Sequence, residues 1–142
     1  MTITISTDTG LLDIGLIHRF LSEESGWANG IALATVQNSI RHSLCFGVYA
    51  GTEQIGFARV VTDRATTAYL CDVFFIASHR GRGLARRLIA AVLAHPDLQG
   101  LRRFSLASST ARPLYEKFGW TALVNPVIHM ERFNPDAYAK EA

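Results

Sequence analysis

The chain is poor in the residues on which several protein classes depend. Only two of its 142 residues are cysteines, Cys45 and Cys71, and both lie inside apolar, strand-like runs. This placement favours reduced core thiols over a disulfide scaffold. No group of histidines, cysteines and acidic residues has the spacing of metal ligands, so the sequence predicts that the protein binds no metal.

Long apolar runs are missing as well. No run approaches the roughly 20 residues that span a bilayer, and the amino-terminal stretch MTITISTDTGLL has no basic segment followed by an apolar one. A secretory signal would have both. The formal net charge is only +2, and the sequence has no acidic or basic tail. We therefore expect a cytoplasmic protein that does not act at a membrane.

The residues that are present suffice for one globular domain. Hydrophobic residues make up 49% of the chain, which is enough for a sizeable core at this length. No repeat, linker or low-complexity segment divides the sequence. We therefore expect residues 1–142 to form a single domain.

Hydrophobic spacing in the first half of the chain predicts helices and then strands. Apolar residues recur at helical spacing in residues 11–25 and 31–40, which predicts two helices before the first strand. Strand-length runs rich in Val, Ile, Phe and Tyr follow at 44–50, 54–62 and 67–76. Short polar turns separate these runs, so they predict an antiparallel meander.

The second half of the chain completes an α+β fold. Its expected elements are a helix at 84–94, a strand at 102–108, a helix at 111–118 that ends at Gly119, and a closing pair of strands at 120–124 and 126–133. Because a long helix precedes it, the strand at 102–108 should lie parallel to the strand at 67–76 through a right-handed crossover. The expected architecture is a mixed, mostly antiparallel central sheet flanked by helices.

The stretch FFIASHRGRGLARRLIAAVLAH, residues 74–95, changes from a buried strand to a glycine-punctuated turn and then to a helix. Residues 80–85 lie at the start of that helix, where amide N–H groups lack partners and the helix dipole favours anions. The turn therefore suits a phosphate group. An ordinary helix start with solvated arginines is the alternative.

Three other motifs fit this turn less well. A dinucleotide-binding fingerprint would use Gly81 and Gly83, but it requires a small residue where Arg86 stands. A P-loop requires Gly-Lys followed by Ser or Thr, and the sequence has no such tripeptide. The arginines of the turn are not extended by further basic helices or aromatic platforms, so we do not expect a nucleic acid as partner.

Two motifs place the turn in a more specific context. Arg80, Gly83 and Ala85 fit the pattern Arg or Gln, x, x, Gly, x, Gly or Ala, and the segment LYEKFGW places Tyr115 shortly before Gly119. In these motifs, and in the order of its elements over essentially the whole chain, the sequence resembles the GNAT superfamily of acyl-CoA-dependent N-acetyltransferases. The resemblance implies that the pyrophosphate of acetyl-CoA binds at the turn.

The resemblance also implies catalytic and binding roles. Tyr115 would be the general acid that protonates the leaving thiolate, unless it only packs, and main-chain N–H groups around Phe75 would stabilise the oxyanion. Asp72, in the middle of a strand, would accept the amine proton through water, unless it faces solvent or makes a core hydrogen bond. The residues expected to bind acetyl-CoA are Phe74, Phe75, Arg80, Gly81, Arg82, Gly83, Leu84 and Ala85.

The acceptor would approach along the loop between the two leading helices. Glu24 and Trp27 would bind a cationic amine by charge attraction and cation–π contact, unless Glu24 is a solvated helix end and Trp27 a core residue. The implied function is transfer of acetyl from acetyl-CoA, as cosubstrate, to a primary amine of a small molecule or peptide by direct attack in a ternary complex. A non-catalytic acyl-CoA-binding or regulatory module of the same fold is the alternative, and a homodimer is compatible with either.

Overall fold

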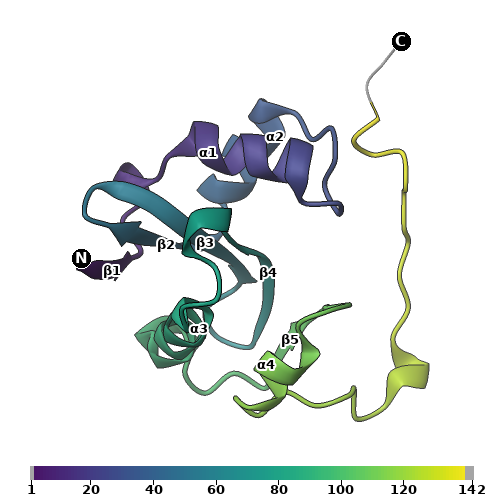
Figure 1. The fold of residues 1–142 in the computed structure, drawn as a ribbon. Helices are drawn as coiled ribbons and strands as arrows, with labels where there is room; N and C mark the ends of the chain where they lie inside the picture. Colours follow the sequence, from purple (N-terminus) through teal and green to yellow (C-terminus); the bar gives the residue numbers. More distant parts are fainter. Residues whose placement is uncertain (1, 140–142) are drawn as a thin grey trace.

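A five-stranded sheet runs through the centre of the computed structural model, which describes residues 2–139 (Figure 1). The strands lie side by side in chain order, and all neighbours are antiparallel except the last pair, which is parallel. They are β1 (Ile3–Ser6), β2 (Leu44–Ala50), β3 (Glu53–Thr62), β4 (Thr67–Phe75) and β5 (Arg103–Leu106). The predicted mixed, mostly antiparallel sheet and its parallel crossover are confirmed.

Helices cover both faces of the sheet, so the fold has three layers (Figure 1). On one face lie α1 (Ile14–Arg19), which continues as a π-helical turn (Phe20–Glu24), and α2 (Leu33–Arg41). On the other lie α3 (Leu84–Ala94) and α4 (Arg112–Glu116). Short 3-10 turns complete the structure at Thr9–Leu11, Ala77–His79, Pro96–Leu98 and Pro126–Ile128. No helix among residues 2–139 is long and apolar enough to cross a bilayer.

Each face of the sheet has its own hydrophobic core, because alternate strand residues point to opposite sides. Phe57 of β3 packs with the α1 and α2 side, where Phe20 stacks on Phe74 with ring centroids 4.0 Å apart. Leu88 of α3 and Val60 of β3 belong to the other core, and both are fully buried. All seven residues of β2 are buried, which agrees with a central strand covered on both faces.

Two predictions at the ends of the chain are wrong. A strand, β1, precedes the first helix and pairs with β2, although two helices were expected before any strand. Its sequence ITIS is too short and polar to give a strand signal, and only its pairing at the sheet edge makes it one. At the other end, the strands expected at 120–124 and 126–133 do not form in the described structure. A strand requires a partner, and here the chain leaves the sheet after Trp120.

We call residues 121–139 the C-terminal segment. It runs as an irregular chain along one side of the molecule, with a 3-10 turn at Pro126–Ile128 and a hydrogen-bonded turn at 135–138 (Figure 1). Its large apolar side chains are open to solvent: Met130 is 96% exposed and Val124 is 89% exposed. The apolar pattern that suggested buried strands is thus present, but it is not buried within this chain.

Candidate active site

The site begins where β5 ends and β4 continues. Pairing between these parallel strands stops at Leu70 opposite Leu106, whereas β4 runs on to Phe75. A pocket of about 550 Å³ opens beside the unpaired part of β4. Residues 69–73 of β4, residues 106–111 after β5, Tyr115 of α4 and Trp27 line this pocket. We refer to it as the β4 pocket.

A β-bulge in β4 shapes one wall of the β4 pocket. Cys71 is paired with Arg59 and Phe74 with Phe57, so two residues of β4, Asp72 and Val73, face a single residue of β3. Asp72 adopts a φ of +55°, a left-handed conformation that Asp tolerates better than most residues. Such bulges commonly re-aim a side chain beside a functional site.

Asp72 is held by two hydrogen bonds from distant parts of the chain. Arg59 Nε donates to Asp72 Oδ2 at 2.8 Å, and the Trp27 indole Nε1 donates to Asp72 Oδ1 at 3.1 Å. Arg59 in turn donates to the hydroxyl of Ser43 at 3.1 Å. The carboxylate therefore lies neither free in solvent nor in an apolar core. It is fixed in an ion pair at the wall of the pocket, and each oxygen retains a lone pair for a further donor.

Arg59 is a site residue that the sequence analysis missed. It lies in the middle of the apolar run GFARVVT, just as Asp72 lies in the middle of YLCDVFF. Opposite charges in adjacent strands of a meander often pair across the sheet. The two interrupted apolar runs were therefore an available signal, although the register that aligns them could not be read from the sequence.

Trp27 lies on the surface of the β4 pocket rather than in the core. Its side chain is 55% exposed, and its ring is tilted against Phe20 at 6.2 Å. Ser25 fixes the loop locally, because its hydroxyl donates to the Leu21 carbonyl and accepts from the Trp27 and Ala28 amides. The alternative in which Trp27 fills the core is therefore wrong.

Glu24 lies away from this arrangement. Its side chain is exposed, and the residue does not contribute to the lining of the β4 pocket. The structure thus brings together three of the four residues predicted for catalysis and acceptor binding, namely Asp72, Tyr115 and Trp27. Glu24 has the position of a solvated helix end, which was the stated alternative.

Tyr115 faces the β4 pocket from α4. It is 7% exposed and packs edge-on against Trp120, with ring centroids 5.8 Å apart. Burial raises the pKa of its phenol above the ordinary value of 10.0. The hydroxyl therefore keeps its proton at neutral pH, as a proton donor must.

The turn between β4 and α3 has the backbone conformation that a phosphate site requires. Gly81 and Gly83 have φ angles of +76° and +73°, and Gly83 is the N-cap of α3. No side chain caps this helix, so its first amide N–H groups stay available to a ligand. Arg80 is anchored by a hydrogen bond of 2.8 Å from its Nε to the Phe75 carbonyl. The remaining guanidinium N–H groups can meet an anion.

The other residues predicted to bind acetyl-CoA divide into two groups. Arg82 is exposed in the turn, and Ala85 is half-buried in the first turn of α3. The side chains of Phe74, Phe75 and Leu84 are buried in the two cores. These three residues can therefore contact a ligand only through their backbone.

The cysteines are poor nucleophiles in this structure. Cys71 lines the β4 pocket, but burial raises the pKa of its thiol from 9.0 to about 11. The same cause raises the pKa of the Cys45 thiol to about 12. Both stay protonated at neutral pH, which disfavours an acyl-cysteine intermediate. Among residues 2–139, no cluster of three or more His, Cys, Asp or Glu side chains could hold a metal ion.

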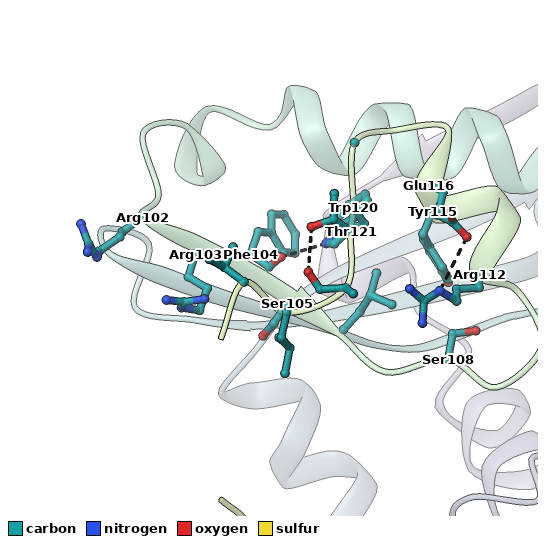
Figure 2. A pocket seen from close by; sticks show the side chains of 15 residues that line it. Arg102, Arg103, Phe104, Ser105, Ser108, Arg112, Tyr115, Glu116, Trp120 and Thr121 are labelled. Carbon is teal, nitrogen blue, oxygen red and sulfur yellow. Dashed lines mark hydrogen bonds and ion pairs between the residues drawn. The ribbon is translucent and has the colours of Figure 1, made fainter. Parts of the chain in front are cut away.

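A second pocket, of about 330 Å³, lies between β5, α4 and residues 119–124 (Figure 2). We call it the β5 pocket. Arg103 and Ser105 of β5, Arg112 of α4 and Trp120 contribute to its lining. The Trp120 indole donates to the Phe104 carbonyl at 2.8 Å, and Arg112 pairs with Glu116 at 3.6 Å. This pocket was not predicted, because residues 120–124, which were expected to form a strand, contribute to its lining as irregular chain.

Comparison with known protein families shows which family has this sequence pattern. The sequence model of the acetyltransferase (GNAT) family matches residues 16–120. The chain belongs to the GNAT family of acetyltransferases. Every residue discussed for catalysis, cosubstrate binding or acceptor binding lies within the GNAT match, whereas the C-terminal segment lies beyond it.

Other GNAT proteins resemble the chain over most of its length. A candidate acetyltransferase of Gibberella zeae is 31% identical over 135 residues, which cover 80% of this chain and 75% of that protein. A crystal structure of a candidate GNAT acetyltransferase from Xanthomonas campestris is 54% identical, has a TM-score of 0.95 and covers 99% of both chains. The structure of a predicted acetyltransferase from Clostridium acetobutylicum with acetyl-CoA is 16% identical, and its TM-score of 0.66 over 94% of this chain and 96% of that one shows a shared fold.

Proposed function

We propose that this GNAT protein transfers the acetyl group of acetyl-CoA to a primary amine by direct attack. The observation that carries the proposal is the β4 pocket, because it brings Asp72, Tyr115 and Trp27 together beside the strand that leads into the turn at 80–85. The presence of acetyl-CoA in the Clostridium acetobutylicum structure supports this choice of acetyl donor.

The turn at 80–85 fits the pyrophosphate of acetyl-CoA. A Cβ built on Gly83 would meet no protein atom within 4 Å, so the space above the turn is open to a ligand. Uncapped amide N–H groups at the start of α3 and the nearby Arg80 guanidinium provide donors and positive charge. Binding there would direct the thioester along β4 toward the β4 pocket.

Each proton in the proposed reaction has a residue to hold it. The amine nitrogen bonds to the thioester carbonyl carbon, and the carbon–sulfur bond breaks. Asp72 accepts the proton of the ammonium through a water molecule, using a lone pair that Arg59 and Trp27 leave free. Tyr115 donates its hydroxyl proton to the leaving sulfur and takes up the second proton that the nitrogen loses when it becomes an amide, while the proton held by Asp72 passes to solvent.

The bulge at Asp72 and Val73 can supply the oxyanion donor. An extra residue in a bulge leaves a main-chain group outside the ladder, and here that group lies at the wall of the β4 pocket. Phe75 lies further along, opposite Gly56 of β3, and the Ile76 amide donates to the Ile55 carbonyl. Phe75 and Gly56 are therefore a non-hydrogen-bonded pair, and the Phe75 N–H points away from β3. We propose both the bulge and the Phe75 N–H as candidate oxyanion donors. A preorganised donor of this kind contributes about 3 kcal/mol to transition-state stabilisation.

The test is release of free thiol from acetyl-CoA in the presence of different amines. The panel should include polyamines, amino acids, aminoglycosides and peptides with free amino termini, and the acetylated product should be identified by mass spectrometry. We expect thiol release that depends on at least one amine. Tight binding of acetyl-CoA without transfer to any of these amines would instead support a non-catalytic binding module.

We propose that Trp27, more than Glu24, contacts the acceptor amine. Trp27 exposes its ring at the β4 pocket, where a cation can lie over it, whereas Glu24 does not line this pocket. Trp27→Ala should raise KM for the amine several-fold and leave KM for acetyl-CoA unchanged. Trp27→Phe separates the causes, because it keeps an aromatic face but removes the N–H that donates to Asp72.

Glu24→Gln serves as the comparison within the same loop. From its exposed position we expect little change in either KM. If instead Glu24→Gln raised KM for the amine and Trp27→Ala did not, charge attraction at the loop rather than the aromatic ring would bind the acceptor. Equal losses in both KM values for Trp27→Ala would assign the loop a structural role.

A further inference from the structure

The β4 pocket offers very little charge to a substrate. Among the described residues that line it, Asp72 is the only one with a formally charged side chain, since no Glu, Lys, Arg or His contributes to the lining. Burial raises the pKa values of Tyr69, Cys71 and Tyr115 above their ordinary values, so these three groups keep their protons at neutral pH. A substrate that enters the pocket therefore meets a single charged group.

The charge of Asp72 is already balanced by the protein. Its carboxylate pairs with Arg59 at 2.8 Å, and the side chains of Arg59 and Asp72 are 19% and 11% exposed. The guanidinium does not contribute to the lining of the β4 pocket. A carboxylate or phosphate on a substrate would therefore find no cation in the pocket, and a second ammonium group would find no second carboxylate. Burying a charge without such a partner costs free energy.

The open wall of the pocket beside Asp72 is aromatic. Leu70 belongs to the core on the α3 side, so the alternation of β4 points Tyr69 and Cys71 to the opposite face of the sheet, on which α1 and α2 lie. The core on that face leaves Tyr69 41% exposed and Trp27 55% exposed, and both residues line the β4 pocket. Exposed aromatic faces in a pocket favour an apolar group of a ligand.

The positions of these groups along β4 set the length of a suitable acceptor. Tyr69 precedes Asp72 in β4, and about 10 Å of strand separates their Cα atoms. The turn at 80–85 follows β4, so acetyl-CoA bound there would approach Asp72 from the other end of the strand. An amine with its nitrogen at Asp72 would extend away from acetyl-CoA, and it needs an apolar body of several carbon atoms to reach the Tyr69 ring.

We propose that the acceptors of this protein are primary monoamines with an apolar body of about the size of a hexyl or phenylethyl group and no second charge. The amine lies at Asp72, and its body lies against Trp27 and Tyr69. Polyamines, aminoglycosides and amino acids carry further charges that the β4 pocket leaves unpaired, so they are poor acceptors. This inference rests on the proposed function, because it names the class of amine that the same site takes.

Two matched pairs of amines test the effect of charge. Hexylamine and 1,6-diaminohexane differ by one ammonium group, and 2-phenylethylamine and phenylalanine differ by one carboxylate. We expect kcat/KM, measured by thiol release from acetyl-CoA, to be at least roughly tenfold higher for the monoamine of each pair, because the added charge is left unpaired. Propylamine has the same charge as hexylamine but too short a body, so it should be a poor acceptor as well.

The outcomes separate this inference from the proposed function. If 1,6-diaminohexane or phenylalanine matched its monoamine in kcat/KM, the inference would be overturned and acetyl transfer to amines would stand. Preference for a peptide amino terminus, which presents polar amides instead of an apolar body, would have the same meaning. If no amine of any kind caused thiol release, the proposed function would be overturned and the inference with it.

Tyr69→Ala tests the aromatic wall. KM for 2-phenylethylamine should rise several-fold, whereas KM for propylamine and KM for acetyl-CoA should not change. Tyr69→Phe keeps the ring and should behave like the wild type. Val61→Ala is the matched control, because Val61 lies opposite Tyr69 in β3 and is 43% exposed but does not line the pocket. An unchanged KM for 2-phenylethylamine in folded Tyr69→Ala would overturn the placement of the acceptor body.

Ala107→Asp supplies the second carboxylate that the pocket lacks. Ala107 is exposed, lines the β4 pocket and directly follows β5, the strand that pairs with the part of β4 that contains Tyr69. In Ala107→Asp, kcat/KM for 1,6-diaminohexane should rise relative to that for hexylamine. The same ratio should keep its wild-type value in Ala107→Asn, which adds a side chain of the same shape without the charge. A ratio that is equal in the two variants would show that charge does not select the acceptor, and would overturn the inference.

Discussion

Tyr115 combines two properties that a proton donor needs. It is buried enough for the pKa of its phenol to be raised, and it still borders the β4 pocket. A phenol in such a position is protonated over the whole neutral range, as the proposed transfer of its proton to a leaving sulfur requires. The residue that packs against it, Trp120, fixes the ring from the opposite side.

Removal of the Tyr115 hydroxyl should separate catalysis from folding. Tyr115→Phe keeps the ring contact with Trp120, so we expect unchanged stability and unchanged affinity for acetyl-CoA. We expect kcat to fall by roughly ten- to a thousandfold, the loss associated with a general acid. Steady-state kinetics over a range of pH and calorimetry with acetyl-CoA measure both quantities. Tyr138→Phe, which removes a hydroxyl from a 40% exposed tyrosine that does not line the pocket, is the control. A wild-type kcat in Tyr115→Phe at all pH values would leave Tyr115 with a packing role.

Individual site residues differ in how far the sequence predicts them. Tyr115 and Gly83 lie in short motifs, so their local context is contained in the sequence itself. The contact of Trp27 with Asp72 joins residues 45 positions apart, and no periodicity connects them. The same holds for Arg59, whose position opposite the bulge depends on strand register. Side-chain partners of this kind become visible only once the sheet is assembled.

At the scale of elements, the turn into α3 is the most constrained part of the fold. The sequence pattern predicts α3 at 84–94, and the structure has the helix at Leu84–Ala94. Glycines with positive φ on either side of Arg82 let the chain reverse from β4 into this helix. The same glycines leave the amide N–H groups uncovered, so the geometry of the turn also suits the proposed binding of an anion.

Gly83→Val tests the anion site. The new side chain has space within the protein, but it occupies the region where the pyrophosphate must approach, so we expect loss of acetyl-CoA binding measured by calorimetry. A β-branched residue at positive φ also costs about 1–3 kcal/mol in stability. Gly100→Val is a matched control, because Gly100 has a φ of +71° and equal free space but lies outside the turn. It should show the same loss of stability with normal binding. Unchanged affinity in folded Gly83→Val would place the cosubstrate elsewhere.

Helices and strands that carry a clear hydrophobic pattern in their own sequence are predicted well. Strands that form only through pairing with another strand are not. The bounds of β2 and β3 follow from runs of Val, Ile and Phe that are long enough to predict buried strands without knowledge of their partners. β1 is recognisable only through its pairing with β2. The expected closing strands fail for the opposite reason: the residue pattern after Trp120 suits a strand, but within residues 2–139 this part of the chain pairs with no other strand.

At the scale of the whole molecule, one sheet separates two cores. The α1 and α2 core and the α3 and α4 core share the same strands. Loss of packing in one core would loosen these strands and would therefore also disrupt the other core. A domain of this size with a common central sheet is expected to unfold in one cooperative step.

Leu88→Ala tests this cooperativity. Leu88 is fully buried in α3, so the substitution should lower the free energy of unfolding by about 2–5 kcal/mol. Calorimetry should show a single transition at a lower temperature, and circular dichroism of the aromatic residues on the α1 side should change at that same temperature. Two separate transitions, with only one moved by the substitution, would show that the cores unfold independently.

The course of the C-terminal segment also affects how the protein can be immobilised. The Tyr138 carbonyl would lie 2.7 Å from a Cβ added at Gly30, and the loop that contains Gly30 also carries Trp27, which lines the β4 pocket. β1, by contrast, lies at the opposite edge of the sheet from β5. A surface linker attached beside Tyr138 would therefore be held near the β4 pocket, whereas attachment next to β1 would leave that pocket open, so activity screens on solid supports should use the β1 edge.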